Sequence, residues 1–141
     1  MREIKFRGKR IDNGEWVYGD LIWANYLPIR AWVSSIYDGT RLRSMDTADK
    51  TATFRAFEVI PETVGQYTGL KDKKGKEIYE GDIVNYKNQN YVCLYHNDWG
   101  IAQYFYFKYH DGLKQMANHI NTSQLKVIGN ITDNPELIKG E

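Results

Sequence analysis

Residues 64–86 read VGQYTGLKDKKGKEIYEGDIVNY, and this stretch decides the fold. Residues 71–76 contain no apolar side chain, and Gly75 among them can adopt a positive φ because it has no Cβ. Glu80-Gly81-Asp82 has the composition of a second tight turn, and the β-branched and aromatic residues 83–86 are typical of a strand. The stretch therefore predicts a strand, a lysine-rich turn, a short strand, a tight turn and another strand.

The rest of the chain continues this pattern of short strands and turns. Asp12-Asn13-Gly14 is a hairpin turn signal. Residues 87–90 are polar and predict a four-residue hairpin loop, whereas residues 113–120 favour a short helix, with a strand as the alternative. Pro135 in the first turn predicts a last short helix. Further strands are predicted at residues 1–10, 15–23, 31–36, 54–60, 91–95, 101–109 and 123–131.

Composition agrees with an all-β protein of short antiparallel strands. The chain has 141 residues, of which 42% are hydrophobic and 14% aromatic, enough for the core of one domain. No apolar run is long enough for a transmembrane helix, and we expect a protein of the cytoplasm that does not bind membranes. The single cysteine, Cys93, excludes an internal disulfide and a cysteine-based zinc site. With a net charge of +1, the protein as a whole does not attract nucleic acid electrostatically.

Three segments resemble the YopX family, small proteins found mainly in bacterial phages and prophages. They are MREIKFR at residues 1–7, VGQYTGLKDKKGKEIYEGDIV at residues 64–84, and VIGNITDNPEL at residues 127–137. The resemblance spans the whole chain and implies an unusual all-β fold with a barrel-like part. It implies no established activity.

We expect two β-rich parts packed as a single unit. Residues 1–63 form an N-terminal β part with a variable loop at residues 40–53, which has few large apolar side chains. Residues 64–141 run hairpin by hairpin and predict a small SH3-like barrel. Helices are expected to be short at most.

The sequence contains no recognisable catalytic constellation, so we expect no enzyme, metal or cofactor. His96-Asn97-Asp98 and His110-Asp111 have the composition of turns, and no pair of histidines, His119 included, has the helical spacing of a metalloprotease motif. The family-motif turns contain Gly65, Gly69, Gly75, Gly81 and Asp82, and the acidic group Glu77, Glu80 and Asp82 is explained by turn chemistry and ion pairing. A small hydrolase built from a histidine and a carboxylate remains an alternative.

Binding surfaces are the better functional candidates. The chain begins with a basic strand, read either as an edge strand with a charged outer face or as a strand that contacts phosphate. Basic groups beside exposed aromatic rings would bind single-stranded nucleic acid by charge and stacking. The candidates for that role are Arg7, Lys71, Lys73, Lys74, Lys76, Tyr104 and Tyr106.

The favoured hypothesis is an accessory protein that binds protein: a second copy of itself, or a phage or host protein. Nucleic-acid binding is the first alternative.

Overall fold

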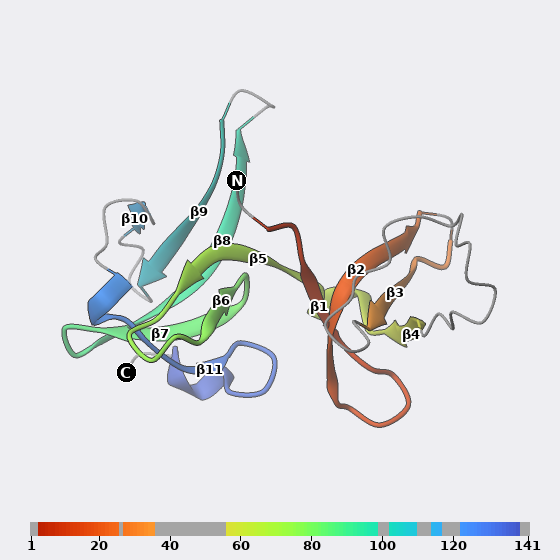
Figure 1. Ribbon diagram of the computed structural model, residues 1–141, viewed down its shortest axis with the longest axis horizontal. Helices are drawn as coiled ribbons and strands as arrows, with labels where there is room; N and C mark the ends of the chain where they lie inside the picture. Colours follow the sequence, from red (N-terminus) through yellow and green to blue (C-terminus); the bar gives the residue numbers. More distant parts are fainter. Residues whose placement is uncertain are drawn as a thin grey trace, which may run out of the picture. The chain divides into compact units, whose positions relative to one another are not determined.

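The computed structural model describes residues 3–25, 27–35, 56–98, 102–109, 114–116 and 122–138 (Figure 1). It is built from short antiparallel strands, with 3-10 turns at Pro61–Thr63, Thr122–Gln124 and Pro135–Leu137. The predicted all-β class is confirmed. The strands are β1 Phe6–Lys9, β2 Trp16–Ala24, β3 Arg30–Ser35, β4 Ala56–Val59, β5 Gly65–Lys71, β6 Glu77–Tyr79, β7 Asp82–Tyr86, β8 Gln89–Asp98, β9 Ala102–Tyr109, β10 Lys114–Met116 and β11 Lys126–Asn130.

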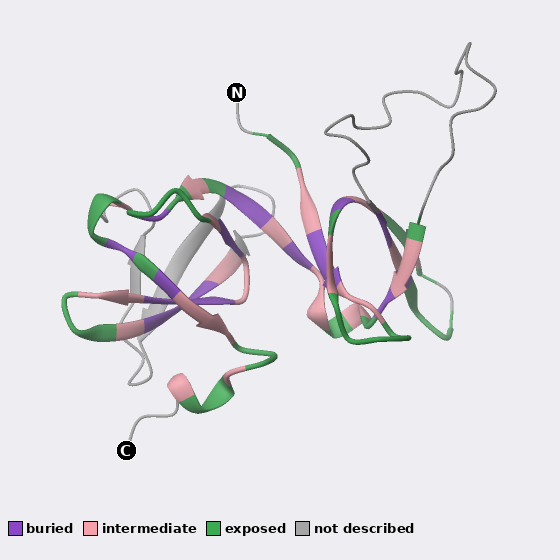
Figure 2. Ribbon diagram, turned by 60° about the horizontal axis from the view of Figure 1, so that its bottom comes forward, coloured by how far each residue is buried: buried purple, intermediate pink, exposed green. Residues whose placement is uncertain are grey.

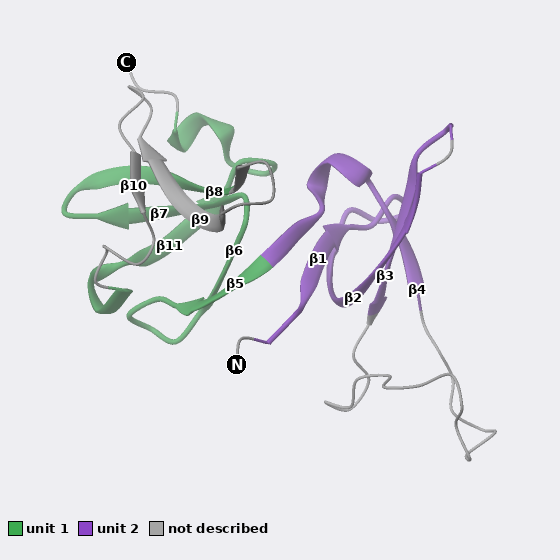
Figure 3. Cartoon of the chain, turned by 90° about the horizontal axis from the view of Figure 1, so that it is seen from above, with its two compact units in different colours: residues 1–2, 67–141 green, residues 3–66 purple. Residues whose placement is uncertain are grey.

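The chain divides into two compact units (Figure 3). Unit 2 comprises residues 3–66, and unit 1 comprises residues 67–141 together with the first two residues. Strand β5 begins in unit 2, where Gly65 and Gln66 pair with β1, and continues into unit 1, where it pairs with β6. The expectation that both parts pack as a single unit stays a prediction. The predicted loop at residues 40–53 lies outside the described residues.

Unit 2 is a sheet with the strand order β4-β3-β2-β1-β5, and it curls so that β4 meets the end of β1. Arg10, just after β1, forms a bridge with Val59 of β4. The Ile60 N–H donates to the Lys9 carbonyl at 2.8 Å, and the Ile11 N–H donates to the Glu58 carbonyl at 3.1 Å. Strand β1 is paired on both sides, so the prediction of an edge strand at the start of the chain was wrong.

The core of unit 2 lies inside this curl. Ala31, Val33 and Val59 are fully buried, and Val17 and Leu21 pack against them. Gly8 lies opposite Val17 in the register, and a Cβ at Gly8 would come within 2.7 Å of the Val59 Cγ2 atom. Glycine therefore allows β1 to approach β4 closely enough to close the curl.

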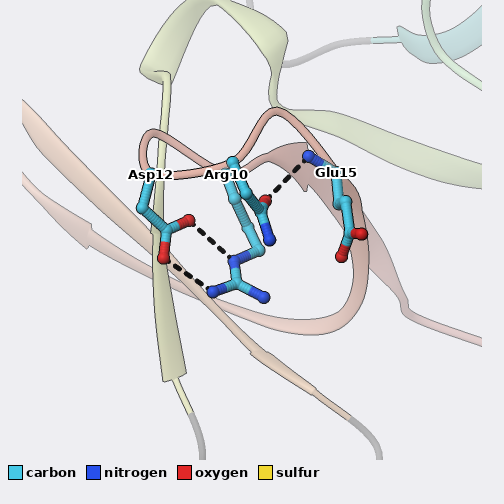
Figure 4. Close-up of polar contacts among 4 residues, drawn as sticks. Arg10, Asp12 and Glu15 are labelled. Carbon is cyan, nitrogen blue, oxygen red and sulfur yellow. Dashed lines mark hydrogen bonds and ion pairs between the residues drawn. The ribbon is translucent and has the colours of Figure 1, made fainter.

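The turn between β1 and β2 is fixed by polar contacts (Figure 4). The Arg10 guanidinium donates to both carboxylate oxygens of Asp12, at 2.9 and 2.7 Å, and these bonds lower the pKa of Asp12. The same guanidinium lies 4.1 Å from the centre of the Phe57 ring. The Asn13 side chain accepts the Glu15 N–H, and Gly14 has φ +74°, as the predicted Asp-Asn-Gly turn requires.

Unit 1 contains a second sheet, with the strand order β10-β9-β8-β7-β11. Its core lies between this sheet and the β5–β6 hairpin, and the buried segments are visible in Figure 2. The buried members are Ile78, Val84, Tyr91, Cys93, Leu125 and Val127. Cys93, which lies between Val92 and Leu94, is fully buried.

Three local predictions in unit 1 were wrong. The β7–β8 connection is a two-residue turn, because Lys87 and Asn88 both adopt positive φ, which matches the twist of the flanking strands. Strand β8 continues through His96 to Asp98, where a turn was predicted, because β9 pairs with it along this length. The segment predicted to favour a helix contains β10, which pairs with β9.

The SH3-like barrel in unit 1 stays a prediction. The pairings among the described strands of unit 1 form an open sheet, in which β10 and β11 are the outermost strands. The β5–β6 turn is nevertheless attached to β11, because the Lys73 N–H donates to the Leu125 carbonyl at 3.0 Å and the Val127 N–H donates to Asp72 at 3.0 Å.

Candidate functional site

The lysine-rich turn between β5 and β6 is organised around Asp72, a residue that the sequence analysis did not single out. One carboxylate oxygen accepts the N–H groups of Lys74 and Lys76 at 2.8 and 2.9 Å, which closes the turn. The other oxygen accepts the Val127 N–H. Gly75 has φ +82° with open space around its Cβ position, so the predicted turn glycine is needed for backbone conformation alone.

Asp72 is 7% exposed although it lies among lysines. Burial by itself would raise the pKa of this carboxyl group. The three backbone N–H bonds and the nearby charge of Lys76 outweigh that effect, so the pKa lies below its ordinary value. Asp72 therefore stays ionised in the folded protein and holds the turn and β11 together.

The lysine side chains of the turn point to solvent. Lys71, Lys73, Lys74 and Lys76 are all exposed. Lys126 is exposed as well, and it lies between Leu125 and Val127, the two residues that bond to the turn. We call these five residues, Lys71, Lys73, Lys74, Lys76 and Lys126, the lysine surface. The sequence analysis missed Lys126 because it is distant in the chain and no local pattern marks it.

The other residues proposed for nucleic-acid binding are not part of the lysine surface. Arg7 lies on β1 in unit 2, where it is only 5% exposed and its guanidinium lies 4.7 Å from the centre of the Trp16 ring. Its predicted contact with phosphate therefore lacks an exposed charge. Tyr104 and Tyr106 lie on β9, which is separated from β11 by β8 and β7. At ~4.8 Å between neighbouring strands, β9 and β11 are about 14 Å apart along the sheet.

The remaining family-motif residues have structural roles. Gly69 has φ +87° where the β5–β6 register shifts, and Gly65 is buried where β5 pairs with β1. Gly81 has φ +94°, and its N–H and carbonyl bond to Cys93 and Ile131, respectively. Asp82 is 2% exposed and accepts the Tyr79 N–H at 2.8 Å. Asp82, the first residue of β7, therefore holds the turn that precedes it, and the family glycines shape the backbone.

A second candidate surface lies at the end of the β2–β3 hairpin in unit 2. The exposed fractions are 47% for Ile22, 41% for Trp23, 91% for Leu27 and 47% for Ile29. We call these four residues the hairpin patch. Ile22 and Trp23 are adjacent on β2 and point to opposite faces of the sheet, so both faces are exposed at this end. In Figure 3 this connection forms a tip at one end of unit 2. The sequence predicted a strand at residues 15–23 and did not reveal the patch.

The part of the chain that the structure describes does not support a metal-dependent active site. No group of three or more histidine, cysteine, aspartate and glutamate side chains there could hold a metal ion. Strand β8 places His96 opposite Tyr104, while His110 and His119 lie outside the described residues. Among the described residues, no helix is long and apolar enough to cross a membrane.

The fold is similar to that of a protein whose crystal structure has been solved. The crystal structure of protein EF1440 from Enterococcus faecalis is similar, with a TM-score of 0.54 and 25% sequence identity. The match covers 99% of this chain and 100% of that one. No curated protein matches the chain.

Family assignment follows from a match over almost the whole chain. The family described as YopX protein matches residues 5–139, which include the strands of both units, the lysine-rich turn and the segment at residues 127–137. The chain belongs to the YopX family.

Proposed function

We propose that this protein is a phage or prophage accessory protein that acts in the bacterial cytoplasm by binding protein. The observation that carries the proposal is the hairpin patch, because large apolar side chains exposed on both faces of one hairpin end offer apolar contact area to a protein partner. Strands β2 and β3 are well paired up to this end, from Gly19 opposite Ser35 to Ala24 opposite Arg30. The patch therefore stands on a regular hairpin.

A second copy of the chain is the proposed first partner. The charged side chains beside the patch already satisfy each other, since the Arg30 guanidinium donates to both Glu58 carboxylate oxygens at 2.9 and 2.7 Å. Because the charges beside this apolar surface are paired with each other, the surface does not select for a charged partner. It can face its own copy across a twofold axis, and the net charge of +1 causes little repulsion between copies.

Replacing Leu27 tests this proposal. Sedimentation velocity of the wild-type protein is expected to show a species heavier than the 16.5 kDa chain. Leu27→Lys is expected to weaken the association about tenfold to a hundredfold, because burial of one leucine contributes about 1.5–3 kcal/mol.

Ile11→Lys is the matched control, since Ile11 is 55% exposed but lies in the β1–β2 turn and not in the patch. This variant is expected to associate as the wild type does. A wild-type protein that remains monomeric at high concentration would refute self-association, and a Leu27→Lys protein that associates normally would exclude the hairpin patch as the contact.

A further inference from the structure

The lysine surface concentrates positive charge at one place in a protein that is nearly neutral overall. Its five side chains are exposed and come from one turn and from the strand bonded to that turn. The ion pairs of the described residues join other groups and involve none of these lysines. Lys71 lies opposite Glu77 in the β5–β6 register, and the charge of the other four lysines is directed outward to solvent.

The backbone holds these lysines together against their mutual repulsion. Asp72 offsets one positive charge, but its carboxylate faces the N–H groups of Lys74, Lys76 and Val127 and is buried beneath the turn. Further bonds fix the ends of the turn: the Asp72 N–H donates to the Lys76 carbonyl at 2.8 Å, and the Lys73 N–H donates to the Leu125 carbonyl at 3.0 Å. A bound anion would find the charges already gathered, so little ordering of the backbone is needed on binding.

We propose that the lysine surface binds the phosphate backbone of nucleic acid without reading its sequence. Lysine carries a compact charge suited to phosphate, and the surface contains no arginine that could form paired bonds to a base edge. Residues 71–76 also contain no apolar side chain that could insert into a lipid bilayer, so phosphate in solution is favoured over a membrane. This site lies in unit 1, whereas the hairpin patch belongs to unit 2.

The salt dependence of binding tests the proposal quantitatively. Fluorescence anisotropy with a labelled DNA duplex of arbitrary sequence is measured between about 50 and 200 mM salt. Each lysine that neutralises a phosphate contributes about −0.9 to the slope of log K against log salt, so five lysines set a limit of about −4.5. The double variant Lys73→Gln with Lys74→Gln is expected to reduce the magnitude of the slope by about 1.8, whatever the sequence of the duplex.

Two controls make the result specific to the lysine surface. Lys9→Gln removes a lysine of β1 in unit 2, which is not part of the lysine surface, and is expected to leave the slope unchanged. Sedimentation of the double variant is expected to match the wild type, which separates this proposal from association through the hairpin patch.

The proposal fails if the duplex does not bind at low salt or if the double variant keeps the wild-type slope. Equal affinity for polyglutamate would also overturn it, because the surface would then attract any polyanion. Stronger binding to vesicles of anionic lipid than to DNA would assign the surface to membranes instead.

Discussion

At the scale of single residues, Asp72 is the group whose loss should be most informative. Asp72→Asn keeps one oxygen for the N–H groups of Lys74 and Lys76 but turns an amide donor toward the Val127 N–H. Because a buried N–H without an acceptor costs about 1–3 kcal/mol, we expect a loss of that size in the free energy of unfolding at neutral pH. Urea denaturation at pH 7 measures it.

The pH dependence follows from the lowered pKa of Asp72. The pKa of the Asp72 carboxyl group is lower in the folded state than in the unfolded state, where it is 3.8. The ionised group therefore stabilises the fold at pH values above 3.8. This stabilisation is lost as the pH falls through the pKa of the folded state. The stability difference between wild type and Asp72→Asn is therefore expected at pH 7 and should shrink below about pH 4. An equal difference at pH 3 would contradict the role given to the ionised carboxylate.

Predictability of single residues depended on whether their partners are local. Gly75 could be assigned from its neighbours, because a turn without apolar residues needs a positive φ. Asp72 and Lys126 could not, because the Asp72–Val127 bond joins positions 55 residues apart. Arg7 was expected at the surface since it alternates with apolar residues, but pairing of β1 on both sides and the Trp16 ring leave it buried.

At the scale of elements, the contact of β1 with β4 through Gly8 and Val59 can be tested by a double-mutant cycle. Gly8→Ala places a Cβ 2.7 Å from the Val59 side chain and is expected to cost about 1–3 kcal/mol. Val59→Ala leaves a cavity and is expected to cost about 2 kcal/mol. The double variant should lose less than the sum, by about 1 kcal/mol, because Val59→Ala removes the two Cγ atoms that the new methyl group meets and leaves only the Cβ contact at 2.9 Å.

Urea denaturation followed by tryptophan fluorescence measures each step of this cycle. Ile83→Val in unit 1 is the control, and its cost is expected to add to that of Gly8→Ala. Simple additivity of Gly8→Ala and Val59→Ala would mean that β1 and β4 do not constrain each other at this point.

Element boundaries were harder to predict than the existence of elements. The segment that became β9 was recognised, because five of its eight residues are tyrosine or phenylalanine, which favour strands. β10 was not, because a three-residue strand is too short to show a period and depends on pairing with β9. His96-Asn97-Asp98 has turn composition, yet the neighbouring strand extends β8 through it. Tertiary pairing overrode local propensity in both cases.

At the scale of the whole molecule, the question is whether the two units unfold together. Each unit has its own buried cluster: Ala31, Val33 and Val59 in unit 2, and the group around Ile78 and Cys93 in unit 1. Strand β5 is the element that carries pairings in both. Separate cores favour separate cooperative transitions, since removal of a buried side chain weakens first the cluster that contained it.

Two probes can follow the units independently in a Trp99→Phe background. The remaining tryptophans, Trp16, Trp23 and Trp32, all belong to unit 2, and Cys93, the single cysteine, is fully buried in unit 1. We expect Val33→Ala to lower the urea midpoint seen by fluorescence while leaving the midpoint for Cys93 thiol labelling in place. Ile78→Ala, at a cost of about 2–5 kcal/mol, should do the reverse. If both probes shift together in both variants, the chain is one cooperative unit, as its sequence predicts, and β5 couples the two cores.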